Sequence, residues 1–245
     1  MSFSFFFKKK KQNLFNGLVD FHNHLLPGID DGSKSIEQSK EMLNIYNELG
    51  IEKIIASPHV FKDLYPNTSK TIKKSYDSLT SSLINQKIKL LGYGAEYMVD
   101  EFFFKELDKK SELLTCFKNH VLIEIPFFGQ LKLLEEALFK LQNVGYVPIL
   151  AHPERYIAIE SSKKIEELKS RGAKMQLNAL SLNGFYGKEV KDKSNNFLRS
   201  QLYDFICTDA HNPYQLKKLK EIYLKKKDIV IWNEIYEKQA EVIVF

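Results

Sequence analysis

Cysteine is scarce in this sequence, which contains only Cys116 and Cys207 among its 245 residues. The two residues lie far apart and belong to no CxxC pattern, so a disulfide framework and a thiolate metal site are both disfavoured. We expect two reduced, buried thiols in a cytoplasmic protein.

Long apolar runs are missing as well, and no segment is long enough to span a bilayer as a helix. Charge of one sign is not concentrated: 36 basic and 31 acidic residues give a net charge of +5 that is spread along the chain. This balance does not favour nucleic-acid binding. No GxGxxG or P-loop pattern follows an expected strand, which disfavours a nucleotide-binding open sheet.

The hydrophobic content of 44% is enough for one sizeable core in a chain of this length. The sequence shows no internal repeat and no low-complexity linker. We therefore expect one domain over residues 17–245, preceded by an N-terminal tail of residues 1–16 that is rich in Phe and Lys.

Short β-rich apolar runs alternate with helical patterns throughout the chain. Strands are expected at Leu18–His22, Lys53–Ser57, Leu90–Glu96, His120–Ile125, Val147–Ala151, Lys174–Asn178 and Asp204–Cys207. Helices are expected at Ser35–Leu49, Thr68–Asn85, Glu101–Leu107, Leu131–Val144, Lys163–Ser170, Val190–Gln201, Pro213–Leu224 and Ile231–Val244. Nearly continuous apolar strands indicate parallel strands buried on both faces. A parallel barrel and an open doubly wound sheet both satisfy this pattern.

Two histidines, His22 and His24, follow the short apolar run of the first expected strand. Residues two apart on a strand point to the same face, so both rings can reach one point. Neutral imidazole is the commonest metal ligand, and His with Asp or Glu suits divalent first-row metals. The pair alone is a weak signal, because His-x-His also occurs by chance.

The other ligand-type residues gather at the same ends of the expected strands. Five of the six histidines lie at or just past a C-terminal strand end: His22, His24, His59, His152 and His211. Three carboxylates end strands: Glu96, Glu124 and Asp209. These ends carry the site in parallel α/β folds, so the pattern predicts a polynuclear metal centre. His120 begins a strand, and we interpret it as structural.

Each of these residues also has a structural interpretation. Glu124 could be half of a buried ion pair, and His59 could be a loop histidine with satisfied hydrogen bonds. Asp30 and Asp31 could cap the helix that begins near Ser35. Taken together, a shared metal centre explains these residues more economically than separate roles do.

Seven blocks carry a resemblance that runs from Leu18 to Tyr214. They are Asp20-Phe-His-Asn-His24, Pro27-Gly-Ile-Asp-Asp-Gly32, Ser57-Pro-His-Val60, Gly94-Ala-Glu96, Ile123-Glu124, Ala151-His-Pro-Glu-Arg155 and Thr208-Asp-Ala-His211. In this order they resemble the PHP (polymerase and histidinol phosphatase) superfamily. Within it, they resemble the bacterial metal-dependent protein-tyrosine phosphatases of capsule and exopolysaccharide loci.

The resemblance implies a distorted seven-stranded (β/α) TIM-like barrel, the PHP fold, with up to three metal ions. It implies manganese first, with iron or zinc as alternatives, which suits a ligand set without thiolate. The implied ligands are His22, His24, Glu96 and Asp209 for one metal, Glu96, Glu124 and His152 for a second, and Asp31, His59 and His211 for a third. Asp30 competes with Asp31, and we favour Asp31 because it precedes Gly32.

The implied activity is the hydrolysis of phosphotyrosine in proteins. Arg155 follows His152 by three residues, and its forked guanidinium suits a phosphate, although a structural ion pair is the alternative role. Asp209 or His211 could relay a proton. The cysteine-dependent phosphatases need an Arg six residues after the Cys, and Leu122 and Pro213 occupy those positions.

Two other functions stay open at this point. One is a small-molecule phosphatase of the histidinol-phosphate type. The other is a non-catalytic, metal-binding partner subunit, which is disfavoured because every expected ligand position holds a ligand-type residue. The partner that the resemblance implies is a bacterial membrane tyrosine autokinase that controls capsule or exopolysaccharide synthesis.

The N-terminal tail is expected to be dispensable for chemistry, and it is either a disordered or loosely docked segment or a weak peripheral membrane anchor. Its apolar part precedes its charges, the reverse of a signal peptide, and combines Phe3, Phe5, Phe6 and Phe7 with Lys8 to Lys11. Full-length protein should sediment with anionic vesicles more than a protein that begins at Gln12, and high salt should release it. Equal sedimentation of the two proteins would contradict this prediction.

Overall fold

The computed structural model of the chain describes residues 13–83 and 88–243, and its strands form two parallel sheets. The sheet of three strands has the order β1-β2-β4, and the sheet of six has the order β3-β5-β6-β7-β8-β9. The strands are β1 (Val19–Asp20), β2 (Lys53–Ala56), β3 (His59–Val60), β4 (Lys89–Tyr93), β5 (Glu96–Met98), β6 (His120–Glu124), β7 (Val147–Ala151), β8 (Lys174–Asn178) and β9 (Phe205–Cys207). The predicted α/β class with parallel strands is confirmed.

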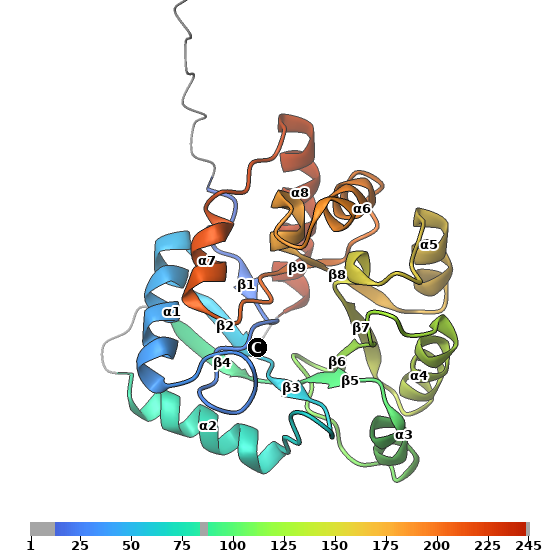
Figure 1. The fold of residues 1–245 in the computed structure, drawn as a ribbon, viewed down its shortest axis with the longest axis horizontal. Coiled ribbons are helices and arrows are strands. Elements are labelled where there is room, and N and C mark those ends of the chain that lie inside the picture. The colour runs from blue at the N-terminus through green and yellow to red at the C-terminus, as the bar shows by residue number, and fades with distance from the viewer. Residues whose placement is uncertain (1–12, 84–87, 244–245) are drawn as a thin grey trace, which may run out of the picture.

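Helices follow the strands and lie around the outside of the sheets (Figure 1). They are α1 (Ile36–Leu49), α2 (Ser69–Ser81), α3 (Glu101–Asp108), α4 (Leu131–Asn143), α5 (Ser162–Ser170), α6 (Lys188–Arg199), α7 (Pro213–Leu219) and α8 (Lys226–Val242). All eight expected helices are present, with ends that differ from the predicted ones by a few residues. None of the helices in the described residues has the length and apolar character needed to cross a membrane.

Helix α1 begins and ends as its sequence predicts. The Ser35 hydroxyl accepts the backbone N–H of Gln38, and Gly50 ends the helix with a φ of 82°. Ser35 alone is the N-cap, so Asp30 and Asp31 do not serve as helix caps. Helix α2 begins with a capping box between Thr68 and Thr71.

One predicted strand is interrupted, and one strand was not predicted. The segment expected as one strand over Leu90–Glu96 forms β4 and β5, separated at Gly94, and the unpredicted β3 follows β2 after Pro58. A Cβ atom on Gly94 would lie 2.9 Å from the Cα atom of Cys116, so the backbones approach more closely than a side chain would allow. Consequently Glu96 begins a strand, although the sequence predicted that it ends one.

The two sheets meet where the first and last strands lie in contact. Beyond the ends of β1 and β9, Asn23 and Ala210 form an isolated parallel bridge. The side chain of Gln239 on α8 joins the same strands: its Nε2 donates to the carbonyls of Val19 (2.8 Å) and Ile206 (3.0 Å), and its Oε1 accepts the Ile206 N–H (2.8 Å). The buried side-chain amide of Gln239 therefore links β1 and β9 in place of the regular hydrogen bonds between paired strands.

The buried hydrophobic residues form a large cluster of helix and strand residues and a smaller cluster composed mainly of strand residues, and the smaller one contains both cysteines as buried free thiols, as predicted. His120 lies at the start of β6, where its ring stacks on Phe117 at 4.5 Å. Residues 1–12 of the predicted tail lie outside the described residues, as do the last predicted residues of the second and eighth helices.

Gln239→Ala should destabilise the protein by about 2–4 kcal/mol, because it removes three buried hydrogen bonds and leaves the Val19 and Ile206 groups without partners. Urea unfolding measures this as a lower midpoint with an unchanged slope. Glu237→Ala, on the exposed side of the same helix, is the control and should stay close to wild type. Equal midpoints for the two variants would show that Gln239 does not join the strands.

Candidate metal centre

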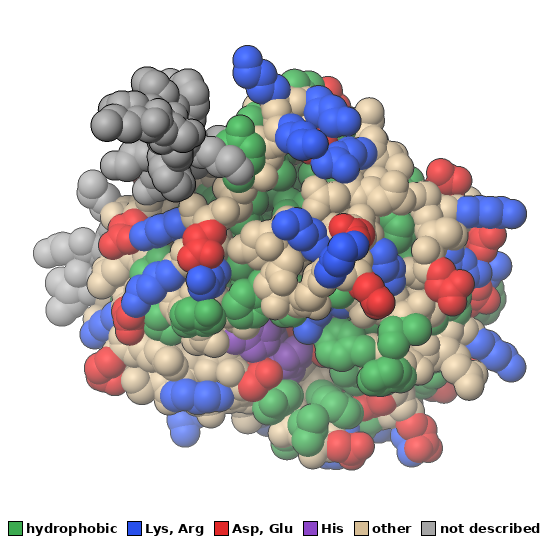
Figure 2. Space-filling model, turned by 45° about the horizontal axis from the view of Figure 1, so that its top comes forward, with side chains coloured by type: hydrophobic (Ala, Val, Ile, Leu, Met, Phe, Trp, Pro, Cys, Tyr) green, Lys and Arg blue, Asp and Glu red, His purple; other side chains and the backbone are tan. Residues whose placement is uncertain are grey.

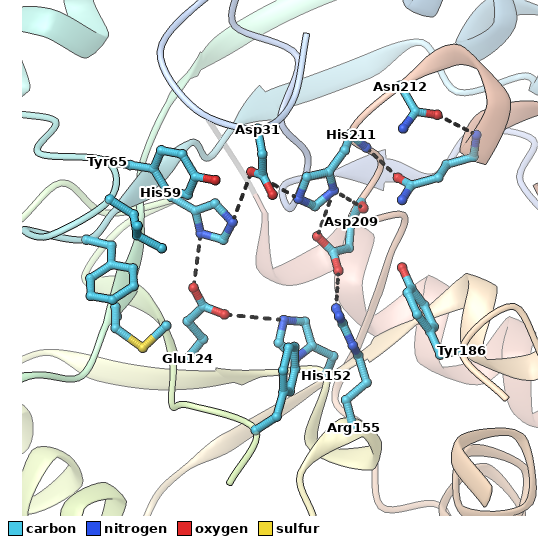
Figure 3. A pocket seen from close by; sticks show the side chains of 15 residues that line it. Asp31, His59, Tyr65, Glu124, His152, Arg155, Tyr186, Asp209, His211 and Asn212 are labelled. Carbon is cyan, nitrogen blue, oxygen red and sulfur yellow. Dashed lines mark hydrogen bonds and ion pairs between the residues drawn. The ribbon is translucent and has the colours of Figure 1, made fainter. Parts of the chain in front are cut away.

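Nine residues predicted as metal ligands converge at the C-terminal side of the strands. Six of them follow β1, β7 or β9, two begin β3 and β5, and one ends β6: His22, His24, Asp31, His59, Glu96, Glu124, His152, Asp209 and His211. Figure 3 shows that the labelled members point toward one cavity. The parallel arrangement thus brings together residues up to 189 positions apart (22 to 211).

The first group joins His22, His24, Glu96 and Asp209, all buried. His22 Nε2 lies 3.1 Å from Glu96 Oε1 and 3.3 Å from Asp209 Oδ1. His24 Nε2 lies 3.4 Å from Glu96 Oε2 and 3.3 Å from Asp209 Oδ1. These four residues match the first predicted ligand set.

A second group lies nearer to the surface and contains Asp31, His59 and His211, with His24 beside them. Asp31 Oδ1 lies 3.5 Å from His59 Nε2 and 3.6 Å from His211 Nε2. Asp31 is half-exposed, whereas Asp30 is buried and binds within the protein. Asp30 accepts from His24 Nδ1 (2.8 Å) and from the backbone N–H groups of Gly32 and His59. Asp31 therefore faces two histidines with an oxygen that could hold a metal ion, whereas Asp30 binds the Nδ1 side of His24.

The third group differs from the prediction in its histidine. His59 Nδ1 lies 3.1 Å from Glu96 Oε2 and 3.0 Å from Glu124 Oε1, so the His59 ring faces two groups at once. The predicted ligand His152 approaches the same carboxylates with its Nε2, at 3.3 Å from Glu96 Oε1 and 3.9 Å from Glu124 Oε2. Glu96 is common to the first and third groups.

Three histidines are fixed through the ring nitrogen that points away from the centre. His22 Nδ1 pairs with Gln176 Oε1 at 2.8 Å, His24 Nδ1 with Asp30, and His211 Nδ1 with the Asp209 carbonyl at 2.9 Å. A donating Nδ1–H leaves the Nε2 lone pair free to bind a metal. The sequence analysis missed Gln176, although its position near the end of β8 was a usable signal.

Several polar atoms of the centre are buried without a hydrogen-bond partner, among them His22 Nε2, His24 Nε2, His59 Nδ1 and both Glu96 oxygens. Such atoms are costly unless something else binds them. They face one another at 3–3.5 Å, which is the arrangement expected of ligands around shared cations. The residues present therefore fit divalent metal ions.

The electrostatics of the centre agree with this fit. Burial alone would lower the pKa of His22, but the carboxylates of Glu96 and Asp209 outweigh it and raise that pKa to about 10. Burial would raise the pKa of Glu96, yet His22 and His59 hold it well below its usual range. The carboxylates thus stay ionised and require nearby positive charge, which divalent metal ions can supply in place of protons.

Arg155 lies at the edge of the centre between two aromatic rings. Its guanidinium carbon is 4.5 Å from the centroid of Phe127 and 4.3 Å from that of Tyr186. Its Nη1 donates to Asp209 Oδ2 at 3.0 Å, and Asn178 Nδ2 donates to the same oxygen at 2.7 Å. The sequence analysis missed Phe127, Asn178 and Tyr186, which hold this arginine.

Two of the ligand residues have strained backbone conformations. His152 and Asp209 have φ values of 34° and 49°, in the left-handed region that residues other than glycine rarely adopt. Glu154, two residues after His152, is buried and accepts from Ser181, Tyr203 and the Asn178 N–H. This network of hydrogen bonds fixes the loop after β7.

The centre opens into a cavity of 430 Å³ that Arg155, Asp31, His59 and His211 help to line. Figure 2 shows histidine side chains at the bottom of a hollow, with hydrophobic side chains beside it. The cavity is large enough for a phosphorylated side chain, and its floor combines metal-ligating groups with one guanidinium. Such a floor can bind and polarise a phosphate group.

Replacing a ligand should lower the metal content without unfolding the protein. We expect His22→Ala and Glu96→Ala, purified without chelators, to retain less metal than wild type because each removes donors from a buried group. His120→Ala is the control, since His120 lies at the opposite end of its strand. Elemental analysis measures the metal, and equal losses in all three variants would contradict the assignment.

The comparisons with known proteins agree with this geometry. The tyrosine-protein phosphatase YwqE of Bacillus subtilis is 34% identical over 197 residues, covering 80% of this chain and 78% of that protein. The tyrosine-protein phosphatase CpsB of Streptococcus pneumoniae is 25% identical and covers 89% of this chain and 100% of its own length.

A solved structure from work on YwqE and CpsB, described as unique metal-dependent tyrosine phosphatases, is similar with a TM-score of 0.75 and 30% identity. It covers 92% of this chain and 94% of the other. Residues 18–243 match the family described as capsular polysaccharide synthesis, CpsB/CapC. The chain therefore belongs to the CpsB/CapC family.

Proposed function

We propose that this protein is a metal-dependent protein-tyrosine phosphatase that hydrolyses phosphotyrosine, a phosphoric monoester hydrolase of the capsule synthesis family. The observation that carries the proposal is the placement of Arg155 beside three connected groups of metal-ligating residues in one cavity. Relatives named as tyrosine-protein phosphatases over most of their length support it.

In this proposal, different residues of the chain bind the phosphate and hold the metal ions. Arg155 binds the phosphate oxygens through its guanidinium, because aromatic rings hold it on both sides and one of its nitrogens is tied to Asp209. Bound divalent metals would supply an activated water and neutralise the charge of the phosphate. Asp209 connects the two functions, since Oδ1 faces His22 and His24 while Oδ2 binds Arg155.

His211 is the residue we assign to proton movement. Both oxygens of Asp209 are engaged within the protein, whereas His211 is less buried and lines the cavity. Its Nδ1 is paired with the Asp209 carbonyl, so proton exchange with the cavity would occur at Nε2. The same Nε2 lies 3.6 Å from Asp31 Oδ1, so His211 can relay a proton only when this nitrogen holds no metal ion of the outer group.

The finer assignments belong to the same proposal. We infer up to three metal ions: donors of histidine and carboxylate type suit manganese, iron or zinc, and the resemblance to the PHP superfamily favours manganese. A phosphotyrosine protein, specifically a bacterial membrane tyrosine autokinase that controls capsule or exopolysaccharide synthesis, is the proposed partner. The cytoplasm, with weak contact to the membrane through the N-terminal tail, is the proposed location.

The proposal also includes the closure of the two sheets. We infer that the two sheets close as one distorted seven-stranded barrel, in which β2 continues as β3 and β4 continues as β5. The support is that β2 pairs with β1 and β4, while β5 pairs with β3 and β6. The Asn23–Ala210 bridge and the Gln239 amide would then close the ring between β1 and β9.

The protein should hydrolyse phosphotyrosine peptides, and chelation should abolish this activity. Manganese should restore turnover better than magnesium, because magnesium prefers oxygen ligands and this site is rich in imidazole. Phosphate release from a phosphotyrosine peptide and from histidinol phosphate measures both claims. Full activity after exhaustive chelation would reject the metal-dependent function, and a strong preference for histidinol phosphate would reject the protein substrate.

The Arg155→Ala variant should bind as much metal as wild type, but its kcat/KM for the phosphorylated substrate should fall. Removing one charged phosphate contact should cost about 2–4 kcal/mol of transition-state stabilisation, or roughly 30- to 1000-fold in kcat/KM. Arg155→Lys should recover only part, because an ammonium group cannot fork. Steady-state kinetics with elemental analysis separate the outcomes: parallel loss of metal would make Arg155 structural, and near-normal kinetics would remove it from the site.

A further inference from the structure

The cavity above the candidate metal-ligating residues has an apolar side, of which the proposed chemistry uses only Phe127, the ring that packs on Arg155. Phe61, Leu64, Met98 and Phe127 line it, and they come from the segment after β3, the end of β5 and the segment after β6. Polar residues, including Asn212 and Gln215, line the cavity elsewhere. In Figure 3 Tyr65 and Asn212 lie on different sides of the cavity.

A tight turn carries two of these apolar residues. Phe61 and Tyr65 pair across the turn, with the Phe61 N–H donating to the Tyr65 carbonyl (3.0 Å) and the Tyr65 N–H to the Phe61 carbonyl (2.7 Å). Asn67 anchors the turn, because its Nδ2 donates to the carbonyls of Ile29 and His59, both at 2.8 Å. The position of the turn is therefore fixed relative to the ligand His59.

The exposure of these side chains points to a ligand rather than to the core. Leu64 is 64% exposed and Phe127 is 40% exposed, although both lie at the mouth of the same cavity. Exposed apolar groups that gather at a cavity mark a surface that binds apolar matter. A side chain as exposed as that of Leu64 adds little to the hydrophobic core, so folding does not explain why a leucine lies at the tip of this turn.

We propose that Phe61, Leu64, Met98 and Phe127 form an apolar slot that binds the aromatic ring of the substrate. The inference rests on the proposed function, which puts the phosphate at Arg155 and the ligand residues on the cavity floor. A phosphotyrosine then has to pass its ring along the apolar side on the way out. Phosphoserine, with one methylene group, leaves the slot filled with water, so the slot makes the site selective for aryl phosphates over alkyl phosphates.

The test compares phosphotyrosine with phosphoserine as substrates of wild type, Leu64→Ser and Phe128→Ser. Leu64→Ser should lower kcat/KM for phosphotyrosine about tenfold, mainly through KM, and leave phosphoserine unchanged, because a few methylene groups discriminate by about that much. Leu64→Met, which keeps an apolar side chain at this position, should retain the wild-type kcat/KM for phosphotyrosine. Phe128→Ser is the matched control: Phe128 is 87% exposed and adjacent to Phe127, but it is not among the cavity-lining residues.

Binding of phenylphosphonate and methylphosphonate, measured by calorimetry, provides the same comparison without turnover. Wild type should bind the phenyl compound more tightly, and Leu64→Ser should lose that preference. An unchanged aryl-to-alkyl ratio in Leu64→Ser, or an equal loss in Phe128→Ser, would overturn the slot. Failure of wild type to hydrolyse phosphotyrosine would reject the proposed function and not the slot. The preference for phenylphosphonate over methylphosphonate would still show whether the slot binds an aromatic ring.

Discussion

Buried negative charge at one end of the strands is the constraint on which the rest of this structure depends. Glu96 and Asp209 are almost fully buried, and their carboxylates lie within 3.5 Å of histidine nitrogens that carry no other hydrogen bond. Buried charge of this density is stable only when it is paired or bound to cations. The surrounding protein therefore fixes the histidines through their outer nitrogens and leaves the inner nitrogens to face the carboxylates.

Asp209 connects the candidate metal-ligating groups to Arg155, the arginine proposed to bind phosphate. One of its oxygens faces His22 and His24, and the other accepts from Arg155 and Asn178. Its backbone has a φ of 49°, a conformation that costs free energy and persists only where the surroundings determine it. The strain lies where the two halves of the proposed chemistry meet, so the phosphate position is coupled to the ligand positions.

The interrupted strands serve the same site. Pro58 and Gly94 break the regular pairing just before His59 and Glu96, and the short strands β3 and β5 then align these two residues in register. In an unbroken strand, successive side chains would alternate between the two faces of the sheet. The breaks let two ligand residues face the centre together, and they are why the described strands form two sheets.

Much of the fold and of the site followed from the sequence alone. Apolar runs alternating with helical patterns predicted the parallel α/β class, and the range Ser35–Leu49 predicted for the first helix is nearly that of α1, which Ser35 caps and Gly50 ends. The candidate ligand residues could be listed from the sequence because each was expected near a strand end or a turn, and the structure brings them together although Glu96 begins β5. Arg155 was singled out by its position three residues after His152.

Only the tertiary structure decided which of these residues share a group. The sequence favoured Asp31 over Asp30 merely by its neighbour, whereas the structure buries Asp30 against His24 and turns Asp31 toward His59 and His211. Gln176, Asn178 and Tyr186 escaped notice because their roles depend on partners more than twenty residues away. Local patterns fix where an element begins and ends, but distances between residues on different strands arise only when the sheets assemble.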